Sequence, residues 1–135
     1  MVQLSSYLSF NGQCEAAFTF YAKCLDGELG PVFRYAGSPM AQDVPADWQD
    51  KIMHGSVKIG DQVLMGADIL SHQYEAPKGF SISIQIKGAT HAERIFRALA
   101  EGGKIVLPLE KTFWAERFGM VVDRFGIPWQ INCEA

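Results

Sequence analysis

The sequence lacks any long apolar run and any strong excess of charge of one sign. Its apolar stretches fall far below the roughly 20 residues that a membrane-spanning helix needs, and its formal net charge is only −3. The Lys and Arg residues are scattered and form no basic stripe interleaved with aromatic residues, the pattern typical of nucleic-acid-binding proteins. The first residues show neither the basic nor the apolar region of a secretory signal. We therefore expect no membrane partner, no nucleic-acid partner and no export signal.

Cysteine is scarce, with three residues, an odd number, and no Cys-x-x-Cys pair. Cys14 and Cys24 fall ten residues apart in one expected helix, which separates them by roughly 15 Å along its axis. A disulfide cannot span that distance. Cys133 lies near the end of the last expected strand. We therefore expect reduced thiols, a cytoplasmic location and no structural zinc site.

The sequence also contains no Gly-x-Gly-x-x-Gly or Walker motif, so a nucleotide-phosphate cradle is not expected. Its composition is ordinary for a globular protein, with 48% hydrophobic and 20% charged residues. At 135 residues the chain is long enough for a real core and short enough for one domain spanning 1–135.

What the sequence does contain is a repeat. Each copy has an amphipathic stripe with apolar residues at i, i+3, i+4 and i+7, one face of a helix. The first stripe is Ala17, Phe20, Tyr21 and Cys24, and about 75 residues later the second is Ala92, Ile95, Phe96 and Leu99. A glycine follows each stripe by three residues, at Gly27 and Gly102, where a left-handed C-cap is expected.

The elements around each stripe repeat as well. In the first copy we expect a strand at 7–10, a helix at 13–26, a strand at 29–36, an irregular loop at 37–50, and strands at 51–59 and 62–67 joined by a Gly60-Asp61 turn. In the second copy we expect a strand at 80–86, a helix at 89–101, a strand at 104–109 and a final hairpin turning at 123–126. The pattern predicts an α+β fold: tandem β-α-β-β-β modules, 3–70 and 80–135, forming a cupped mixed sheet around a shared cavity.

Several strings resemble one known family. They are Tyr7-Leu-Ser-Phe-Asn-Gly12, Phe20-Tyr21, Lys58-Ile-Gly-Asp-Gln-Val-Leu-Met65, Lys111-Thr-Phe-Trp-Ala115 and the long string 118–132. Together they resemble the PhnB-like branch of the vicinal oxygen chelate superfamily, which includes glyoxalase I, extradiol dioxygenases, and fosfomycin- and bleomycin-resistance proteins. The resemblance covers essentially the whole chain and implies a homodimer whose cavities are completed by pairing.

The resemblance also implies where a metal would be held, by one side chain from the first and last strand of each module. Counting along the repeat places these positions near Ser6, Met65, Ser81 and Gln130. Hydroxyl, thioether and amide groups are poor ligands for Zn²⁺, Ni²⁺, Fe²⁺ or Mn²⁺. We therefore expect no metal and no cofactor, and whether the chain is an enzyme stays open.

His54 is the best single candidate for a functional residue. In the Gly60-Asp61 hairpin it should lie opposite Ala67, and Ser56 opposite Met65, so that alternation turns His54, Ser56 and Met65 toward the cavity. A purely structural strand histidine is the competing interpretation.

Trp114, with Phe113 and Phe118, lies in a segment without clean strand period and is interpreted either as a cavity lid or as a core aromatic. The expected ligand-binding set is Ser6, His54, Ser56, Met65, Ser81, Trp114 and Gln130.

We therefore predict metal-independent binding of a small organic molecule. One alternative is a metal-dependent lyase or dioxygenase-type enzyme with atypical ligands. Another is a protein that binds a second protein and keeps a vestigial cavity.

Overall fold

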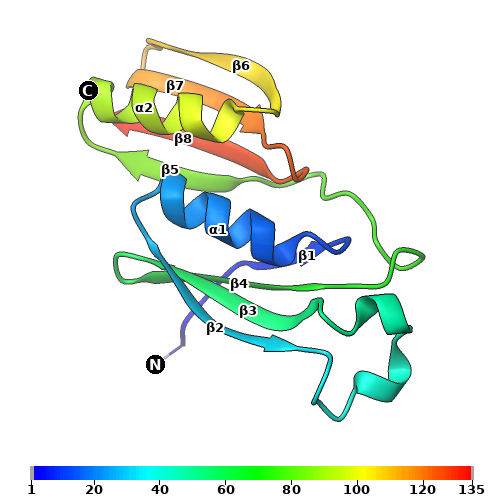
Figure 1. The fold of residues 1–135 in the computed structure, drawn as a ribbon. Helices are drawn as coiled ribbons and strands as arrows, with labels where there is room; N and C mark the ends of the chain where they lie inside the picture. The colour runs from blue at the N-terminus through cyan, green and yellow to red at the C-terminus, as the bar shows by residue number, and fades with distance from the viewer. Residues whose placement is uncertain (1, 135) are drawn as a thin grey trace. The chain divides into compact units, whose positions relative to one another are not determined.

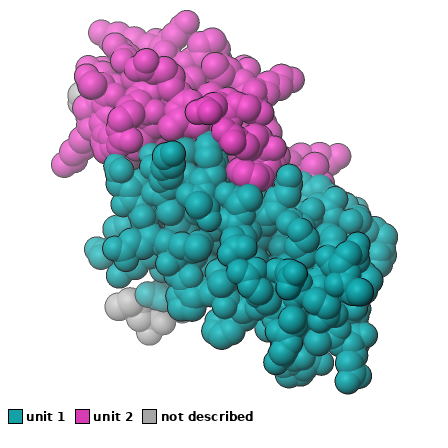
Figure 2. Space-filling view, viewed as in Figure 1, with its two compact units in different colours: residues 1–75 teal, residues 76–135 magenta. Residues whose placement is uncertain are grey.

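The computed structural model describes residues 2–134, and the chain divides after Glu75 into two compact units, shown in different colours in Figure 2. In the described residues each unit has one α-helix and one four-stranded mixed sheet (Figure 1). No helix in the described part of the chain is long and apolar enough to cross a membrane. The predicted α+β class is confirmed.

Unit 1 follows the predicted β-α-β-β-β order. Its elements are β1 (Tyr7–Phe10), α1 (Cys14–Cys24), β2 (Glu28–Arg34), β3 (Ile52–Ile59) and β4 (Gln62–Asp68). The strands are ordered β1-β4-β3-β2, with β1 parallel to β4 and the other pairs antiparallel. The expected loop at 37–50 contains two short 3₁₀ helices, η1 (Ala41–Asp43) and η2 (Ala46–Trp48).

Unit 2 repeats this topology. Its elements are β5 (Ile82–Ile86), α2 (Ala89–Ala100), β6 (Lys104–Glu110), β7 (Ala115–Val122) and β8 (Pro128–Glu134). The strand order β5-β8-β7-β6, again with one parallel pair, matches that of unit 1 element for element. The internal repeat predicted from the helix stripes is therefore a repeat of the structure.

Each helix packs its apolar stripe on its own sheet, against glycine backbone. In α1 the predicted Ala17, Tyr21 and Cys24 are buried, but Phe20 is only half-buried and Phe18 is buried in its place. The Phe18 ring meets Phe10 edge-on at 5.7 Å and would lie 2.9 Å from a Cβ at Gly66. In α2 the predicted stripe is buried as expected, and Phe96 would lie 2.7 Å from a Cβ at Gly119. Glycine in these strands therefore lets each helix approach its sheet closely.

The two helix ends differ. Gly102 has φ +75°, as the predicted left-handed C-cap requires, but in unit 1 the left-handed residue is Asp26, with φ +54°. The prediction for Gly27 was therefore wrong. A glycine is needed there because a Cβ would lie 2.5 Å from the carbonyl oxygen of Lys58, so the constraint is close packing of chain on chain.

A buried carboxylate joins three segments of unit 1. Asp68, 1% exposed at the end of β4, accepts hydrogen bonds from the backbone N–H of Cys14 and of Ile52, each at 2.9 Å. Its carbonyl accepts the hydroxyl of Tyr35 at 2.7 Å. Burial raises the pKa of the Asp68 carboxyl. The start of α1 and the start of β3 are thereby tied to the end of β4.

All three cysteines are buried, and none of them forms a disulfide with another described residue. Burial raises the pKa of the Cys14 thiol far above its ordinary value, and the charges of Asp68 and Glu15 raise it further. In the last hairpin Asp123 accepts the N–H groups of Phe125 at 2.8 Å and Ile127 at 3.0 Å, the turn chemistry that its position suggests. Its other oxygen accepts the indole N–H of the buried Trp129 at 2.8 Å.

Candidate functional site

In unit 1 the face of the sheet opposite α1 gathers polar and apolar side chains. The strand register pairs Tyr7 with Met65, Met65 with Ser56, and Phe33 with His54, so these side chains share one side of the sheet. We call this side, defined by Tyr7, Phe33, His54, Ser56 and Met65, the helix-free face of unit 1. The predicted pairing of Ser56 with Met65 is confirmed. On its β2 side His54 pairs with Phe33, and its predicted position opposite Ala67 of β4 stays a prediction.

His54 lies between two aromatic rings on this face. Its Nδ1 is 3.1 Å from the hydroxyl of Tyr7, and the two rings have centroids 5.7 Å apart with planes tilted by 31°. On the other side the Phe33 ring lies 6.4 Å away, tilted by 33°. Tyr7 and Phe33 are 51% and 55% exposed. The imidazole is therefore held by rings that themselves remain accessible.

Tyr7 is a site residue that the sequence reasoning missed. Partial burial raises the pKa of its hydroxyl, and the Cys14 side chain adds to the increase. A phenol in this environment keeps its proton and stays available as a hydrogen-bond donor. The missed signal was the parallel pairing of β1 with β4, which brings Tyr7 beside Met65.

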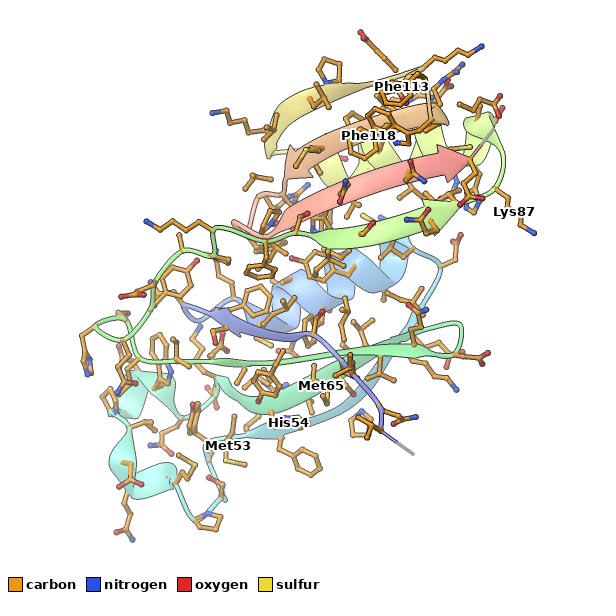
Figure 3. The ribbon with its side chains drawn as sticks, turned by 180° about the vertical axis from the view of Figure 1, so that it is seen from behind. Met53, His54, Met65, Lys87, Phe113 and Phe118 are labelled. Atoms are coloured by element: carbon orange, nitrogen blue, oxygen red, sulfur yellow. The ribbon has the colours of Figure 1, made fainter. Side chains whose placement is uncertain are left out.

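Met53 is a second residue missed from the sequence, and a strand irregularity places it. The register of β2 with β3 passes from Phe33 opposite His54 to Arg34 opposite Ile52, so Met53 is an extra residue in β3. A Cβ at Gly55 would lie 3.2 Å from the Ile52 side chain on the side of α1. Because Ile52 and Gly55 share that side, the bulge leaves Met53 and His54 away from the helix. Met53, His54 and Met65 are labelled on neighbouring strands in Figure 3.

Ser56 points toward the β2 end of the face. Its Oγ packs against Gly30, where any Cβ would overlap it. The register of β2 with β3 shifts between Leu29 and Val32, so Gly30 lies in a second irregularity. A glycine inside an expected strand is the signal that could have located this close approach. Gly30 therefore decides how near β2 can come to the Ser56 hydroxyl.

Of the four residues at the expected metal positions, Met65 and Gln130 lie in strands, whereas Ser6 and Ser81 each precede one. Ser6 precedes β1 and contributes its carbonyl to the backbone N–H of Met65 at 3.1 Å, while the side chain paired with Met65 is that of Tyr7. In unit 2 Gln130 pairs with Ser83, and Ser81 precedes β5. Within residues 2–134 no three His, Cys, Asp or Glu side chains are grouped so that they could hold a metal ion.

The face of unit 2 opposite α2 carries neutral polar groups beside an aromatic cluster. The register pairs Ser83 with Gln130 and Gln85 with Asn132. Asn132 donates from Nδ2 to the Gln85 side chain at 2.8 Å, and its buried Oδ1 has no partner among the described residues. Phe118 pairs with Asn132 from β7 and contributes the first ring of the cluster.

Trp114 lies in the connection between β6 and β7 rather than in the core. Its ring meets Phe118 edge-on at 5.2 Å and Phe113 at 4.8 Å. Trp114 is 51% exposed and Phe113 is 97% exposed. The hydroxyl of Thr112 accepts the N–H of Trp114 at 3.3 Å and of Ala115 at 3.0 Å, which shapes this turn. The core interpretation is therefore excluded for Trp114 and Phe113 but holds for Phe118, which is buried, and the lid remains a prediction.

The expected set is thus divided between the units. Ser6, His54, Ser56 and Met65 belong to unit 1, and Ser81, Trp114 and Gln130 to unit 2. A shallow polar hollow of about 270 Å³ lies elsewhere in unit 1, and none of the seven residues lines it. Its lining residues are Asp26, Gly27, Glu28, Lys58 and Gly60.

Two β-α-β-β-β units with this strand order define the glyoxalase/bleomycin-resistance class of α+β folds. The genomically encoded fosfomycin resistance protein FosX from Listeria monocytogenes is similar in fold, with a TM-score of 0.67 over 100% of this chain and 95% of that chain at 12% identity. Within the class, the model of the family described as 3-demethylubiquinone-9 3-methyltransferase matches residues 2–132. The chain belongs to this PhnB-like family of the vicinal oxygen chelate superfamily.

Two relatives are similar along nearly their whole length. Protein YjdN of Escherichia coli is 34% identical over 137 residues, which cover 96% of this chain and 93% of that protein. The crystal structure of protein PA1353 from Pseudomonas aeruginosa has a TM-score of 0.89 and 46% identity, covering 99% of this chain and 98% of that chain. The resemblance first suggested by the sequence strings is confirmed.

Proposed function

We propose that this protein binds a small organic molecule without the help of a metal, on the helix-free face of unit 1 and on the face of unit 2 opposite α2. The observation that carries the proposal is the hydrogen bond between Tyr7 and His54, formed among side chains that remain partly accessible. Ligand sites commonly combine apolar walls with a few fixed polar groups. Met53, Met65 and Phe33 would supply such walls, and His54 the fixed polar group.

In this proposal Tyr7 acts as a positioning residue. The proposal takes the His54 tautomer that carries its proton on Nε2, in which Nδ1 accepts the Tyr7 hydroxyl. The Nε2–H group is then the single hydrogen-bond donor that His54 offers to a ligand. A ligand that carries a carbonyl, carboxylate or similar acceptor oxygen beside an apolar body fits this arrangement.

The rest of the predicted set completes the proposed pocket. Met65 and Ser56 flank His54 in unit 1. Ser6 in unit 1, and Ser81, Trp114 and Gln130 in unit 2, would contribute hydroxyl, indole and amide groups to ligand binding, each on its own unit. We further propose a homodimer, as the resemblance implies, and a cytoplasmic location, since cysteines that form no disulfide fit a reducing compartment.

Two other activities fit the residues less well. Ser6, Met65, Ser81 and Gln130 offer no imidazole or carboxylate, so they do not suit the divalent metals of the superfamily's enzymes. Methyl transfer, which the family description names, would normally accompany a doubly wound parallel sheet, whereas both sheets here are mixed. We derive no reaction step through a metal or a methyl donor.

Elemental analysis and a ligand screen on the untagged protein test the proposal together. We expect no stoichiometric Zn, Ni, Fe or Mn, and we expect aromatic carboxylates or amides to shift the NMR signals of the His54 ring. About one metal per chain, lost on substitution of Met65 and Gln130, would overturn it. A screen in which every bound compound perturbs other residues and leaves His54 unchanged would do the same.

A further inference from the structure

The outer strand of unit 2 is a sheet edge that exposes apolar side chains, although its pairing with β7 is irregular on either side of Leu107. β6 pairs with β7 on one side and ends the sheet on the other (Figure 1). Ile105, Val106 and Leu107 are 50%, 53% and 42% exposed, three consecutive residues in one strand. An exposed apolar edge strand offers unpaired N–H and C=O groups to another chain, and natural proteins seldom leave one uncovered.

The charges at the two ends of β6 indicate which kind of partner strand could pair with this edge. Lys104 and Glu110, at the two ends of the strand, are both exposed, and neither forms an ion pair with another described residue. The two residues lie three positions before and three positions after Leu107. A second copy of the strand, laid antiparallel with Leu107 facing its own counterpart, therefore sets Lys104 opposite Glu110 of the partner subunit at both ends.

We propose that β6 is an interface between two copies of this chain, joined edge to edge as an antiparallel pair centred on Leu107. Hydrogen-bonded and non-bonded residue pairs alternate in such a ladder. If the two Leu107 residues form a hydrogen-bonded pair, Val106 faces Pro108 of the partner subunit as a non-bonded pair. Pro108, which has no backbone N–H, then lies at a position where the ladder needs no hydrogen-bond donor.

The corresponding edge of unit 1 shows why the choice falls on β6. β2 also begins and ends with opposite charges, Glu28 and Arg34, but Arg34 is already bound to Glu15 at 2.8 Å and to the carbonyl of Asp50 at 2.8 Å. The centre of β2 is Pro31, which would face itself in a symmetric pair and leave no donor there. In β2, therefore, one terminal charge is already paired and the central residue cannot donate. In β6 neither terminal charge is in an ion pair with another described residue, and the central residue, Leu107, has an N–H group.

Phe113 extends the proposed interface at its ends. It follows Glu110 by three residues and is 97% exposed, although it belongs to the most apolar class of side chain. In the proposed pair Glu110 faces the first residue of β6 in the second copy, so the segment after Glu110 runs beside the residues that precede that strand. Apolar area at both ends would add to a short ladder that is weak by itself.

Charge reversal and charge exchange test the register. Sedimentation equilibrium of the whole protein at low ionic strength is expected to show a dimer. Lys104→Glu and Glu110→Lys should each raise its dissociation constant by roughly tenfold or more, since each turns two attractive pairs into repulsive ones. The double variant should restore the dimer. Glu28→Lys on the edge of unit 1 is the matched control and should change nothing. The amides of Ile105, Leu107 and Leu109 should exchange with solvent more slowly in the dimer.

The outcomes separate this interface from the homodimer proposed above, on which it rests. A dimer that neither single variant weakens, or a double variant that fails to recover, overturns the β6 interface and leaves the homodimer standing. A protein that stays monomeric at all accessible concentrations overturns both. Circular dichroism of each variant establishes that a lost dimer is not a lost fold.

Discussion

The hydroxyl of Tyr7 lies 3.1 Å from Nδ1 of His54, across 47 positions of sequence and on two strands that are not neighbours in the sheet. β4 lies between β1 and β3, and the two long side chains meet over it. The contact brings a residue of the first strand and a residue of the third strand into one polar group on the helix-free face of unit 1.

Replacing His54 by Ala should weaken ligand binding by about 1–3 kcal/mol, the cost of losing a polar partner in a binding site. Because His54 is only half-buried, the melting temperature should change little. Isothermal titration with any compound found in the screen, together with thermal unfolding, measures both quantities. His72→Ala, at an exposed position, is the control. A lower melting temperature with unchanged affinity would show that His54 is structural.

Replacing Tyr7 by Phe removes one hydroxyl and keeps the ring beside His54. We expect the affinity to fall by about 0.5–1.5 kcal/mol, the net value of a typical hydrogen bond, because the imidazole loses its orientation. Tyr35→Phe is the matched comparison, since its hydroxyl instead donates to the buried carbonyl of Asp68. That variant should lose stability and retain affinity. Equal affinity in Tyr7→Phe and the wild type would contradict the positioning role.

Replacing Asp68 by Asn should destabilise unit 1 by about 1–3 kcal/mol, because an amide cannot accept both backbone N–H groups that the carboxylate accepts. The loss should depend on pH. Burial raises the folded-state pKa of Asp68, so folding favours the protonated carboxyl; this pH-linked part of its stability is fully present below the unfolded-state pKa and is lost as pH rises through the folded-state pKa. Asn does not titrate.

The difference between the wild type and Asp68→Asn should therefore grow as pH falls from neutral into the acid range. Urea unfolding at a series of pH values measures it. A difference that is constant with pH, or that shrinks as pH falls, would mean that the charged carboxylate is the form that folding favours.

Replacing Trp114 by Phe should remove most of the fluorescence that acrylamide quenches easily. Trp114 is 51% exposed, whereas Trp129 is 1% exposed and holds its indole N–H on Asp123. If the connection between β6 and β7 closes over a bound molecule, ligand-induced quenching should disappear with Trp114 as well. A ligand response that survives in Trp114→Phe would place the bound molecule away from this connection.

The sequence by itself determined the repeated unit and most of its elements. The strand at Tyr7–Phe10, the Gly60 turn and the pairing of Ser56 with Met65 all follow from local rules, because apolar period and turn residues act over a few positions. The sequence segments that resemble the family indicated the fold class in the same way. The turn formed by Asp123 could be predicted from the residues that follow it.

The tertiary structure decided the features that these local rules do not determine: strand pairing, the strand irregularity and core packing. The parallel pairing of β1 with β4 brings Tyr7 to His54, and no local pattern specifies which strands pair across a connection of this length. The bulge at Met53 breaks the alternation on which face assignments depend. Phe18 replaces Phe20 in the core because Gly66 offers its ring room against the sheet. Contacts between distant segments, rather than the preferences of single residues, therefore built the candidate site.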